Sequence, residues 1–178
     1  MKETEIRGAI AEMAKTLIEL NQGTDDLILM GVHRRGVQIA QLLKEQIEGD
    51  HHFAVPFGTL DITFYRDDLL TIGPKPVVGQ TCLPDGGIES KRLVIVDDVL
   101  FTGRTARAGL NELMDWGRPA KVYLGVLIDR GGREIPVQPD FIGKKIEVPE
   151  GHTVDVKVPE IDGEWGVEMI SLTGEDHG

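Results

Sequence analysis

Two short apolar runs, each followed by a segment with helical spacing, constrain the fold more than any other feature of this sequence. The runs are Leu27–Gly31 and Leu93–Val96, and both are continuous where a half-exposed strand would alternate with polar residues. Helical spacing of apolar residues follows from Val37 to Ile47 and from about Thr105 to Trp116. Alternating strands and helices predict an α/β fold, in which an open, mostly parallel sheet is flanked by helices on both faces.

Further segments add to this sheet. An amphipathic helix precedes the first strand, with apolar residues at helical spacing from Ile6 to Leu20 and with Gly23 as its stop. Phe53–Tyr65 and Lys121–Ile128 are rich in β-branched and aromatic residues and are predicted strands. We therefore expect at least four strands in the sheet.

The pattern changes beyond Ile128. Alternating segments at Thr153–Val158 and Val167–Leu172 flank Asp162-Gly163, which predicts a small antiparallel appendage at the carboxyl end. The whole chain has 178 residues, enough for one sizeable core and too few for two ordinary domains. Residues 1–178 are thus predicted to form one domain.

Charge and composition narrow the function. The chain has 19 basic and 30 acidic residues, a net charge of −11, which disfavours nucleic acid as its only partner. It has a single cysteine, Cys82, and no stretch approaching the ~20 apolar residues of a membrane span. Without a signal peptide at its start, it is expected to be a soluble cytoplasmic protein with no membrane partner.

One long stretch, about 66–90, lacks an apolar period. It contains four glycines and three prolines. Loops of this length inside a compact domain are usually lids, binding loops or disordered segments. We favour a functional lid over a merely long connection.

The chemistry is concentrated where the second apolar run ends. Asp97 and Asp98 follow the run, and the turn Thr102–Thr105 opens the next helix. Ligands of open α/β sheets bind at the carboxyl ends of the strands. This turn offers backbone amides, two hydroxyls and a helix N-terminus to a phosphate, and ionised carboxylates accept hydrogen bonds from sugar hydroxyls. The segment predicts a ribose 5-phosphate cradle; the alternative is that the two acids merely cap the helix.

The segment Val96–Thr105 resembles the signature for 5-phosphoribosyl 1-diphosphate (PRPP) in type I phosphoribosyltransferases. It is most similar to one family, the bifunctional pyrimidine operon attenuation protein and uracil phosphoribosyltransferase. The similarity covers nearly the whole chain and extends through Gly31–Gly36, Leu60–Leu69, Gly117–Pro119, Asp129–Gly131 and Pro139–Lys144. This resemblance implies that uracil and PRPP give UMP and diphosphate, with Mg²⁺ held mainly through PRPP and no dedicated metal site in the protein. Because the anomeric carbon develops oxocarbenium character, the protein would mainly orient the reactants and stabilise the departing charge.

The resemblance also assigns residues. Catalytic roles would fall to Asp97, Asp98 and Arg35. Contacts with PRPP or UMP would come from Arg34, Arg35, Asp97, Asp98, Val99, Leu100, Phe101, Thr102, Gly103, Arg104, Thr105, Arg130 and Val154. Within this set, the two adjacent arginines would bind the diphosphate. For the valine, ordinary core packing is an equal alternative.

The lid would begin with Tyr65, Arg66, Asp67 and Asp68, again by resemblance. Closure matters because the activated sugar must meet uracil and not water.

The family's second activity is RNA binding: with a pyrimidine nucleotide bound, its members attach to the leader mRNA of their own operon. The candidate RNA-binding residues are Lys15, Arg133 and Lys144. Gly132 and Gln138 stand where histidine and arginine are common in the family, so we expect a thinned basic surface and rank catalysis above RNA binding. The expected partners are PRPP, uracil, UMP or UTP, the pyrimidine operon leader mRNA and further copies of this chain in a homodimer or higher homo-oligomer.

Two alternatives stay open: a regulator with little catalysis, and a phosphoribosyltransferase for another base, since a phosphate cradle does not read the base. A nicotinamide dehydrogenase is disfavoured because no Gly-x-Gly-x-x-Gly follows a strand.

Overall fold

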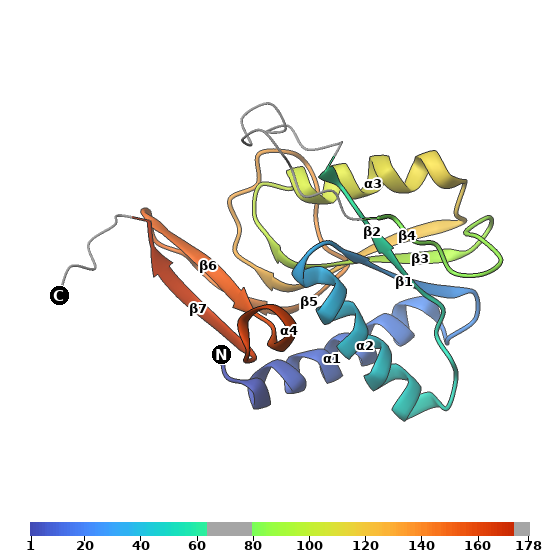
Figure 1. The fold of residues 1–178 in the computed structure, drawn as a ribbon, viewed down its shortest axis with the longest axis horizontal. Coiled ribbons are helices and arrows are strands. Elements are labelled where there is room, and N and C mark those ends of the chain that lie inside the picture. Colours follow the sequence, from blue (N-terminus) through green and yellow to red (C-terminus); the bar gives the residue numbers. More distant parts are fainter. Residues whose placement is uncertain (64–79, 173–178) are drawn as a thin grey trace.

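The computed structural model describes residues 1–63 and 80–172, and this part of the chain contains a five-stranded parallel sheet with the order β2-β1-β3-β4-β5 (Figure 1). All four neighbouring pairs are parallel. The strands are β1 (Leu27–Val32), β2 (Phe57–Leu60), β3 (Arg92–Leu100), β4 (Lys121–Asp129) and β5 (Phe141–Lys145). The predicted fold class is confirmed.

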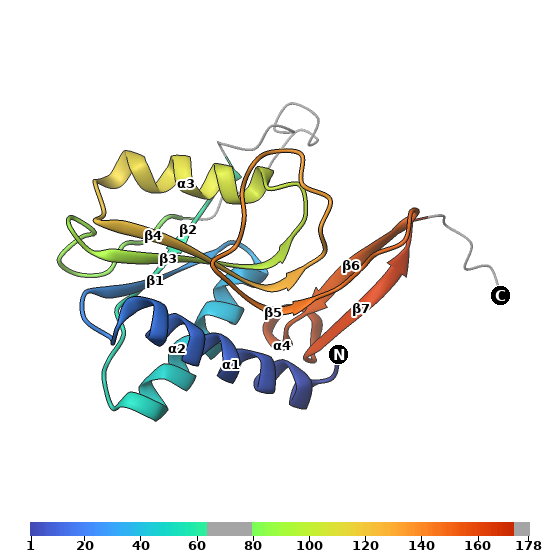
Figure 2. The ribbon, with the colours of Figure 1, turned by 180° about the vertical axis from the view of Figure 1, so that it is seen from behind.

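Helices cover both faces of the sheet, as Figures 1 and 2 show from opposite sides. Helices α1 (Glu3–Asn21) and α2 (Arg35–His51) lie on one face, and α3 (Arg104–Trp116) lies on the other. Side chains of a strand alternate between faces, so Leu29 packs with α1 and α2 while Ile28 packs on the side of α3. Burial on both faces is the reason that β1 and β3 read as continuous apolar runs.

Strand β2 is shorter than expected, because the sequence predicted a strand over Phe53–Tyr65. Only Phe57–Leu60 pairs with β1, and β2 lies at the edge of the sheet. Pro56, which lacks an N–H to donate, precedes the paired residues, and Phe53 is exposed in the connecting loop. Residues 64 and 65 lie outside the described part of the chain.

Strand β5 was not predicted. A loop without a helix leads to it from β4, and its sequence, with Gly143 followed by two lysines, has no apolar run. Tertiary packing creates the strand: Phe141 is only 4% exposed and lies against Gly125 of β4, where an added Cβ would come within 2.3 Å of the ring.

The predicted antiparallel appendage is confirmed as the hairpin of β6 (His152–Lys157) and β7 (Gly166–Ser171), which projects from the body of the molecule (Figure 1). Its connection holds the short helix α4 (Pro159–Asp162) where a tight turn was expected. Val156 and Val167 bury the root of the hairpin in the cluster beneath α1.

Over residues 1–63 and 80–172, no helix is long and apolar enough to cross a membrane.

Candidate functional site

The carboxyl ends of the parallel strands meet at one edge of the sheet, and two glycines let helix α2 approach that edge closely. A Cβ on Gly31 would lie 2.6 Å from the Cα of Val37, and a Cβ on Gly36 would lie 2.7 Å from the carbonyl oxygen of Val96. Because the start of α2 presses on the end of β3, the arginines after β1 come close to the aspartates of β3. The structure thus brings together the two motifs that the sequence analysis singled out.

The turn between β3 and α3 presents an uncapped helix N-terminus. Gly103 has a φ of +91°, a conformation that favours glycine, and no side chain caps the helix. The amide of Arg104 donates a 3.3 Å hydrogen bond to Oγ1 of Thr102. The amides of Thr105 and Ala106 donate to no acceptor among the described residues. Free first-turn amides and the helix dipole make this turn suited to an anion.

The loop between β4 and β5 holds the outer side of this turn. The carbonyl oxygen of Thr102 accepts hydrogen bonds from the amides of Glu134, at 2.9 Å, and Ile135, at 3.2 Å. A Cβ on Gly103 would lie 2.9 Å from Cγ1 of Ile135. The turn is therefore fixed before any ligand binds.

Hydrogen bonds from the side chain of Arg133 also hold this loop against the turn. Its guanidinium donates at 3.0 Å to the carbonyl oxygens of Phe101 and Val137 and at 2.8 Å to Oδ1 of Asp129. The side chain is only 13% exposed. Arg133 is also a predicted RNA-binding cation, but its donors face protein acceptors in this structure; Lys15 and Lys144 are exposed and are the more accessible of the three candidates.

The two aspartates at the end of β3 have different surroundings, although the sequence reasoning treated them alike. Asp97 is 7% exposed, and burial, together with the charge of Asp98, raises its pKa well above the usual range. Asp98 is partly exposed, and its Oδ1 accepts a 2.8 Å hydrogen bond from the amide of Val99. Asp98 is therefore the more available carboxylate for a sugar hydroxyl.

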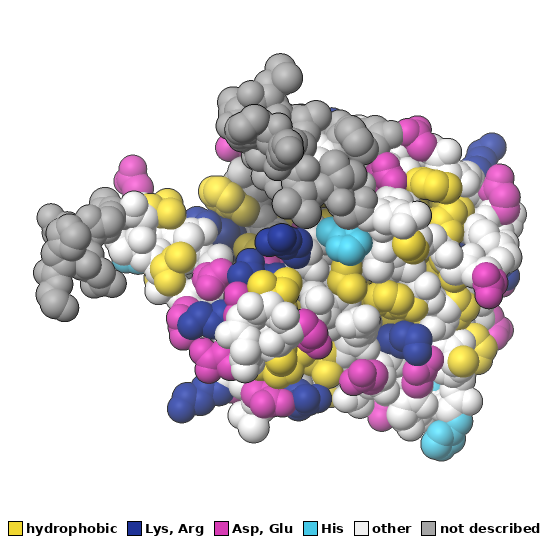
Figure 3. All heavy atoms as spheres, viewed as in Figure 1, with side chains coloured by type: hydrophobic (Ala, Val, Ile, Leu, Met, Phe, Trp, Pro, Cys, Tyr) yellow, Lys and Arg dark blue, Asp and Glu magenta, His cyan; other side chains and the backbone are white. Residues whose placement is uncertain are grey.

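The arginines after β1 also differ. Arg34 is exposed, whereas Arg35 forms a two-point ion pair with Asp162 of α4, with Nε 3.1 Å from Oδ2 and Nη2 2.8 Å from Oδ1. Figure 3 shows Lys and Arg side chains (dark blue) among Asp and Glu side chains (magenta) where the hairpin meets the body. Asp162 is not among the site residues that the sequence predicts, because Asp162-Gly163 there indicates only a turn. No local signal places it beside a residue 127 positions away.

Arg130, after β4, connects the hairpin to the β3–α3 turn. It donates to Oγ1 of Thr153 at 2.8 Å and to the carbonyl oxygen of His152 at 3.2 Å, and its guanidinium lies 3.9 Å from the centre of the Phe101 ring. Val154 is next along β6 and packs in part against the cluster beneath α1. This position is compatible with both alternatives for the valine.

The predicted lid falls largely outside the described residues, as do Tyr65, Arg66, Asp67 and Asp68. Residues 80–90 are described and are fastened to the body. The amide of Thr59 donates to the carbonyl oxygen of Cys82 at 2.9 Å, the reverse bond is 3.0 Å, and Ile88 is 2% exposed. These contacts hold the carboxyl-terminal part of the predicted lid segment, about 66–90, against the body of the molecule.

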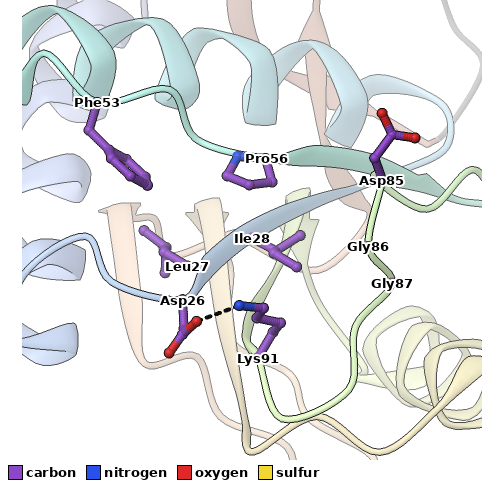
Figure 4. Close-up of a pocket in the computed structure, with 9 residues that line it drawn as sticks. All are labelled: Asp26, Leu27, Ile28, Phe53, Pro56, Asp85, Gly86, Gly87 and Lys91. Carbon is purple, nitrogen blue, oxygen red and sulfur yellow. Dashed lines mark hydrogen bonds and ion pairs between the residues drawn. The ribbon is translucent and has the colours of Figure 1, made fainter.

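Among residues 1–63 and 80–172, no three His, Cys, Asp or Glu side chains gather so that they could hold a metal ion. A cavity of about 480 Å³ lies at the opposite edge of the sheet, by the start of β1 (Figure 4). There Lys91 is paired with Asp26, and Phe53 faces Leu27. The cavity is lined in part by Asp85, Gly86 and Gly87 of the predicted lid segment, and by none of the residues predicted to contact PRPP or UMP.

Comparisons with known proteins give the relatives of this chain. The phosphoribosyl transferase domain family matches residues 2–162. The chain is 49% identical to a "Bifunctional protein PyrR" of Herpetosiphon aurantiacus over 99% of this chain and 97% of that one, and 47% identical to that of Thermus aquaticus over 98% and 96%. Among solved structures, a hypoxanthine phosphoribosyltransferase from Trypanosoma cruzi, crystallised as a ternary substrates complex, matches 98% of this chain and 94% of that one, with a TM-score of 0.71 and 24% identity. That likeness shows a shared fold.

Proposed function

This chain belongs to the PyrR family of phosphoribosyltransferases, and from that premise we propose that it converts uracil and PRPP to UMP and diphosphate and also regulates pyrimidine synthesis by nucleotide-dependent mRNA binding. One observation carries the enzymatic part: the fixed, uncapped N-terminus of α3 lies directly after the two aspartates of β3. A phosphate and a ribose need these two features side by side.

The residues of the site suggest how the reaction proceeds. The 5-phosphate of PRPP binds the first-turn amides of α3, with Thr102 and Thr105 as hydroxyl donors, and Asp98 accepts hydrogen bonds from the ribose hydroxyls. Arg34 and Arg35 bind the diphosphate. With both ends of PRPP held, the anomeric carbon is oriented toward the base, and the arginines stabilise the negative charge that develops on the leaving group. No side chain acts as a nucleophile.

Mg²⁺ fits this site as an ion that arrives on the substrate. The partly exposed carboxylate of Asp98 is a suitable oxygen ligand, but the described residues form no cluster of three acidic or histidine side chains. When bound, the ion supplies positive charge to the leaving diphosphate. The protein is left to position the sugar and the base.

We assign the base side to Arg130, which joins the hairpin to the β3–α3 turn, and, by family resemblance, to Val154 of β6. Uracil itself follows from the family and not from these contacts, so another base is the alternative. We further propose that residues 1–178 form one domain, supported by the burial of the hairpin root beneath α1.

RNA binding rests on family membership, with Lys15 and Lys144 as the candidate contacts. The backbone amide of Lys2 is the main cause that lowers the pKa of Glu5, and the charges of the N-terminus and Lys144 add to it, so an anionic side chain lies near Lys144. Because the protein exposes few basic side chains for contacts with RNA phosphates, we propose that its affinity for the leader mRNA is weak. A nucleotide substrate and an mRNA partner also support a cytoplasmic location.

We propose a homo-oligomer on a separate observation. Near its free end the hairpin exposes Met169, Ile170 and Leu172, whose exposed fractions are 45%, 43% and 66%. Single exposed apolar residues are common, but three on one projecting arm favour a contact with another copy. Light scattering after gel filtration measures the mass; a monomer at micromolar concentration contradicts the proposal.

The test of the enzyme is nucleotide formation with PRPP, Mg²⁺ and one base at a time. We expect UMP from uracil and no product from hypoxanthine, guanine or adenine. Asp98→Asn and Thr105→Ala should each weaken PRPP binding, whereas Asp26→Asn, at the opposite edge, should leave it unchanged. If PRPP binds equally well to all variants, the cradle assignment is wrong.

The test of regulation is a titration of pyrimidine leader RNA with and without UMP, at two salt concentrations. Binding that requires UMP and weakens with salt supports the regulatory function. RNA binding without any turnover of uracil would make this chain a regulator that retains the pocket as a sensor.

A further inference from the structure

We propose that Asp162 is a specificity-determining residue that weakens the binding of PRPP relative to UMP, because its carboxylate occupies the arginine that the diphosphate of PRPP needs. This inference rests on the proposed function, in which Arg35 is a diphosphate ligand. UMP carries a base where PRPP carries the diphosphate, so the two ligands differ at this position. Both place a phosphate at the N-terminus of α3.

The contact between these two side chains has the geometry of a strong ion pair. Nε and Nη2 of Arg35 lie 3.1 and 2.8 Å from the two carboxylate oxygens of Asp162. Parallel two-point pairing of this kind is shorter and stronger than a single contact between exposed charges. It also matches the way in which a guanidinium binds phosphate, so Asp162 and a diphosphate compete for the same two donors.

Asp162 is held in place by its own turn. Its Oδ2 accepts a 2.9 Å hydrogen bond from the amide of Val158, and its own amide donates at 2.7 Å to the carbonyl oxygen of the same residue. The helix then ends at Gly163, whose φ is +80°. Because the carboxylate is fixed at both its backbone and its side chain, it cannot follow the arginine toward a ligand, and the pair must separate when the diphosphate binds.

Other carboxylates strengthen the hold on Arg35. Asp155 of β6 lies 4.0 Å from Nη2 of the arginine. The hydrogen bond with Asp162 is the main cause that raises the pKa of Arg35, and the charges of Asp155 and Asp98 add to it. A guanidinium among three carboxylates presents little net positive charge to an incoming diphosphate.

The consequence is a selective penalty. A ligand with a diphosphate must replace the Asp162 contact, whereas a nucleotide with a single 5-phosphate leaves it intact. The hairpin thus sets the ratio of UMP affinity to PRPP affinity, which decides how a nucleotide-dependent regulator responds when both ligands are present.

The decisive variant is Asp162→Asn in the full chain, because an asparagine side-chain oxygen still accepts the hydrogen bond from Val158. By calorimetric titration with Mg²⁺ present, we expect PRPP to bind about three- to tenfold more tightly. UMP affinity should change less than about twofold, since UMP has no diphosphate that would have to replace Asp162 on Arg35. The melting temperature of each variant confirms that it is folded.

Glu160→Gln is the matched control, since it removes one negative charge from the same short helix and Glu160 is exposed. It should leave the PRPP to UMP affinity ratio unchanged. In an Arg35→Gln background, Asp162→Asn should lose its effect on PRPP, because the competing donors are gone.

Three results overturn the inference: unchanged PRPP affinity in Asp162→Asn, weaker PRPP binding, or an equal gain for PRPP and UMP. The proposed function fails differently, if the unaltered chain binds neither ligand or if Arg35→Gln binds PRPP as well as the unaltered chain does.

Discussion

The two strand–turn–helix units at the carboxyl edge of the sheet, β1–α2 and β3–α3, differ in how ready they are for a ligand. The β3–α3 unit presents first-turn amides without acceptors among the described residues, and its neighbour, the β4–β5 loop, contacts it through backbone groups and Arg133. The β1–α2 unit presents Arg35 already paired with a carboxylate. The two units share the same local architecture, but the donors of the β3–α3 unit are available to a phosphate, whereas the arginine of the β1–α2 unit is already paired.

The difference originates in the neighbours that the topology provides. Strand β3 lies in the middle of the sheet next to β4, so the loop after β4 falls against its turn. The β1–α2 turn instead faces the hairpin connection, where α4 carries Glu160 and Asp162. A local sequence motif specifies what a turn can bind, and the segment packed against it decides whether its donors are free.

A side chain added inside the β3–α3 turn should have the largest effect on ligand affinity. Gly103→Val adds a side chain at a φ of +91° and against Ile135, which we expect to cost about 1–3 kcal/mol of unfolding free energy. PRPP and UMP should both bind more than about 100-fold more weakly, because both use this turn. Titration calorimetry and urea unfolding measure the two effects.

A glycine elsewhere controls for this change. Gly49 lies on the exposed side of α2 with nothing within 4 Å of an added Cβ, so Gly49→Ala should stabilise the protein by about 0.5–1 kcal/mol and leave both affinities unchanged. A Gly103→Val protein that binds UMP normally would show that the turn is not the phosphate site.

The second largest effect is expected when Arg133, which holds the same turn in place, is removed. Arg133→Ala breaks a largely buried ion pair with Asp129 and leaves the carbonyl oxygen of Phe101 without this donor, which we expect to cost about 2–3 kcal/mol of unfolding free energy. Both ligands should bind about tenfold more weakly, since the turn loses its support. Arg7→Ala, which removes an exposed ion pair with Glu3, should change unfolding by less than about 0.5 kcal/mol.

An outcome in which Arg133→Ala keeps its stability and nucleotide affinity but loses leader RNA binding would contradict the placement described above. It would restore that arginine as a surface contact for RNA.

Substitution of Asp97 should have a smaller effect, a change in folding stability that depends on pH. Its folded-state pKa is raised, so as pH increases from about 4 the unfolded chain loses this proton first, and folding stability falls until the folded-state pKa is passed. Asp97→Asn has no such charge to bury. Its melting temperature should exceed that of the unaltered chain near neutral pH, and the difference should shrink as the pH falls toward about 4.

Thermal unfolding as a function of pH checks this prediction, with nucleotide formation measured on the same samples. Activity should fall in Asp97→Asn even where stability rises. A difference in melting temperature that grows on acidification would mean that Asp97 is stabilised as a carboxylate.

The smallest effect is expected at the opposite edge of the sheet. Asp26→Asn removes the exposed ion pair with Lys91 beside the cavity of Figure 4. The melting temperature should change by less than about 2 °C, and PRPP and UMP affinities should not change. A loss of activity here would show that the two edges of the sheet are coupled.

Local sequence was sufficient for the central features. Each of these features is encoded within a few neighbouring residues and is therefore predicted from the sequence: the buried runs of β1 and β3, the periodicity of α1 and α3, and the turn Thr102–Thr105. The family resemblance had the same source. Strand β5 and the limits of β2 were missed because pairing with a neighbouring strand, and not local composition, decides where an edge strand begins and ends.

The sequence by itself determined the fold class and the turn suited to a phosphate, because strand burial, helix periodicity and turn geometry depend on neighbouring residues. Only the tertiary structure decided which charges are free. Arg133 is turned inward, Asp97 is buried beside Asp98, and Arg35 meets Asp162 across 127 positions of sequence. The physical reason is that the state of a charge depends on burial and on the distance to other charges, and both are set by segments far apart in the chain.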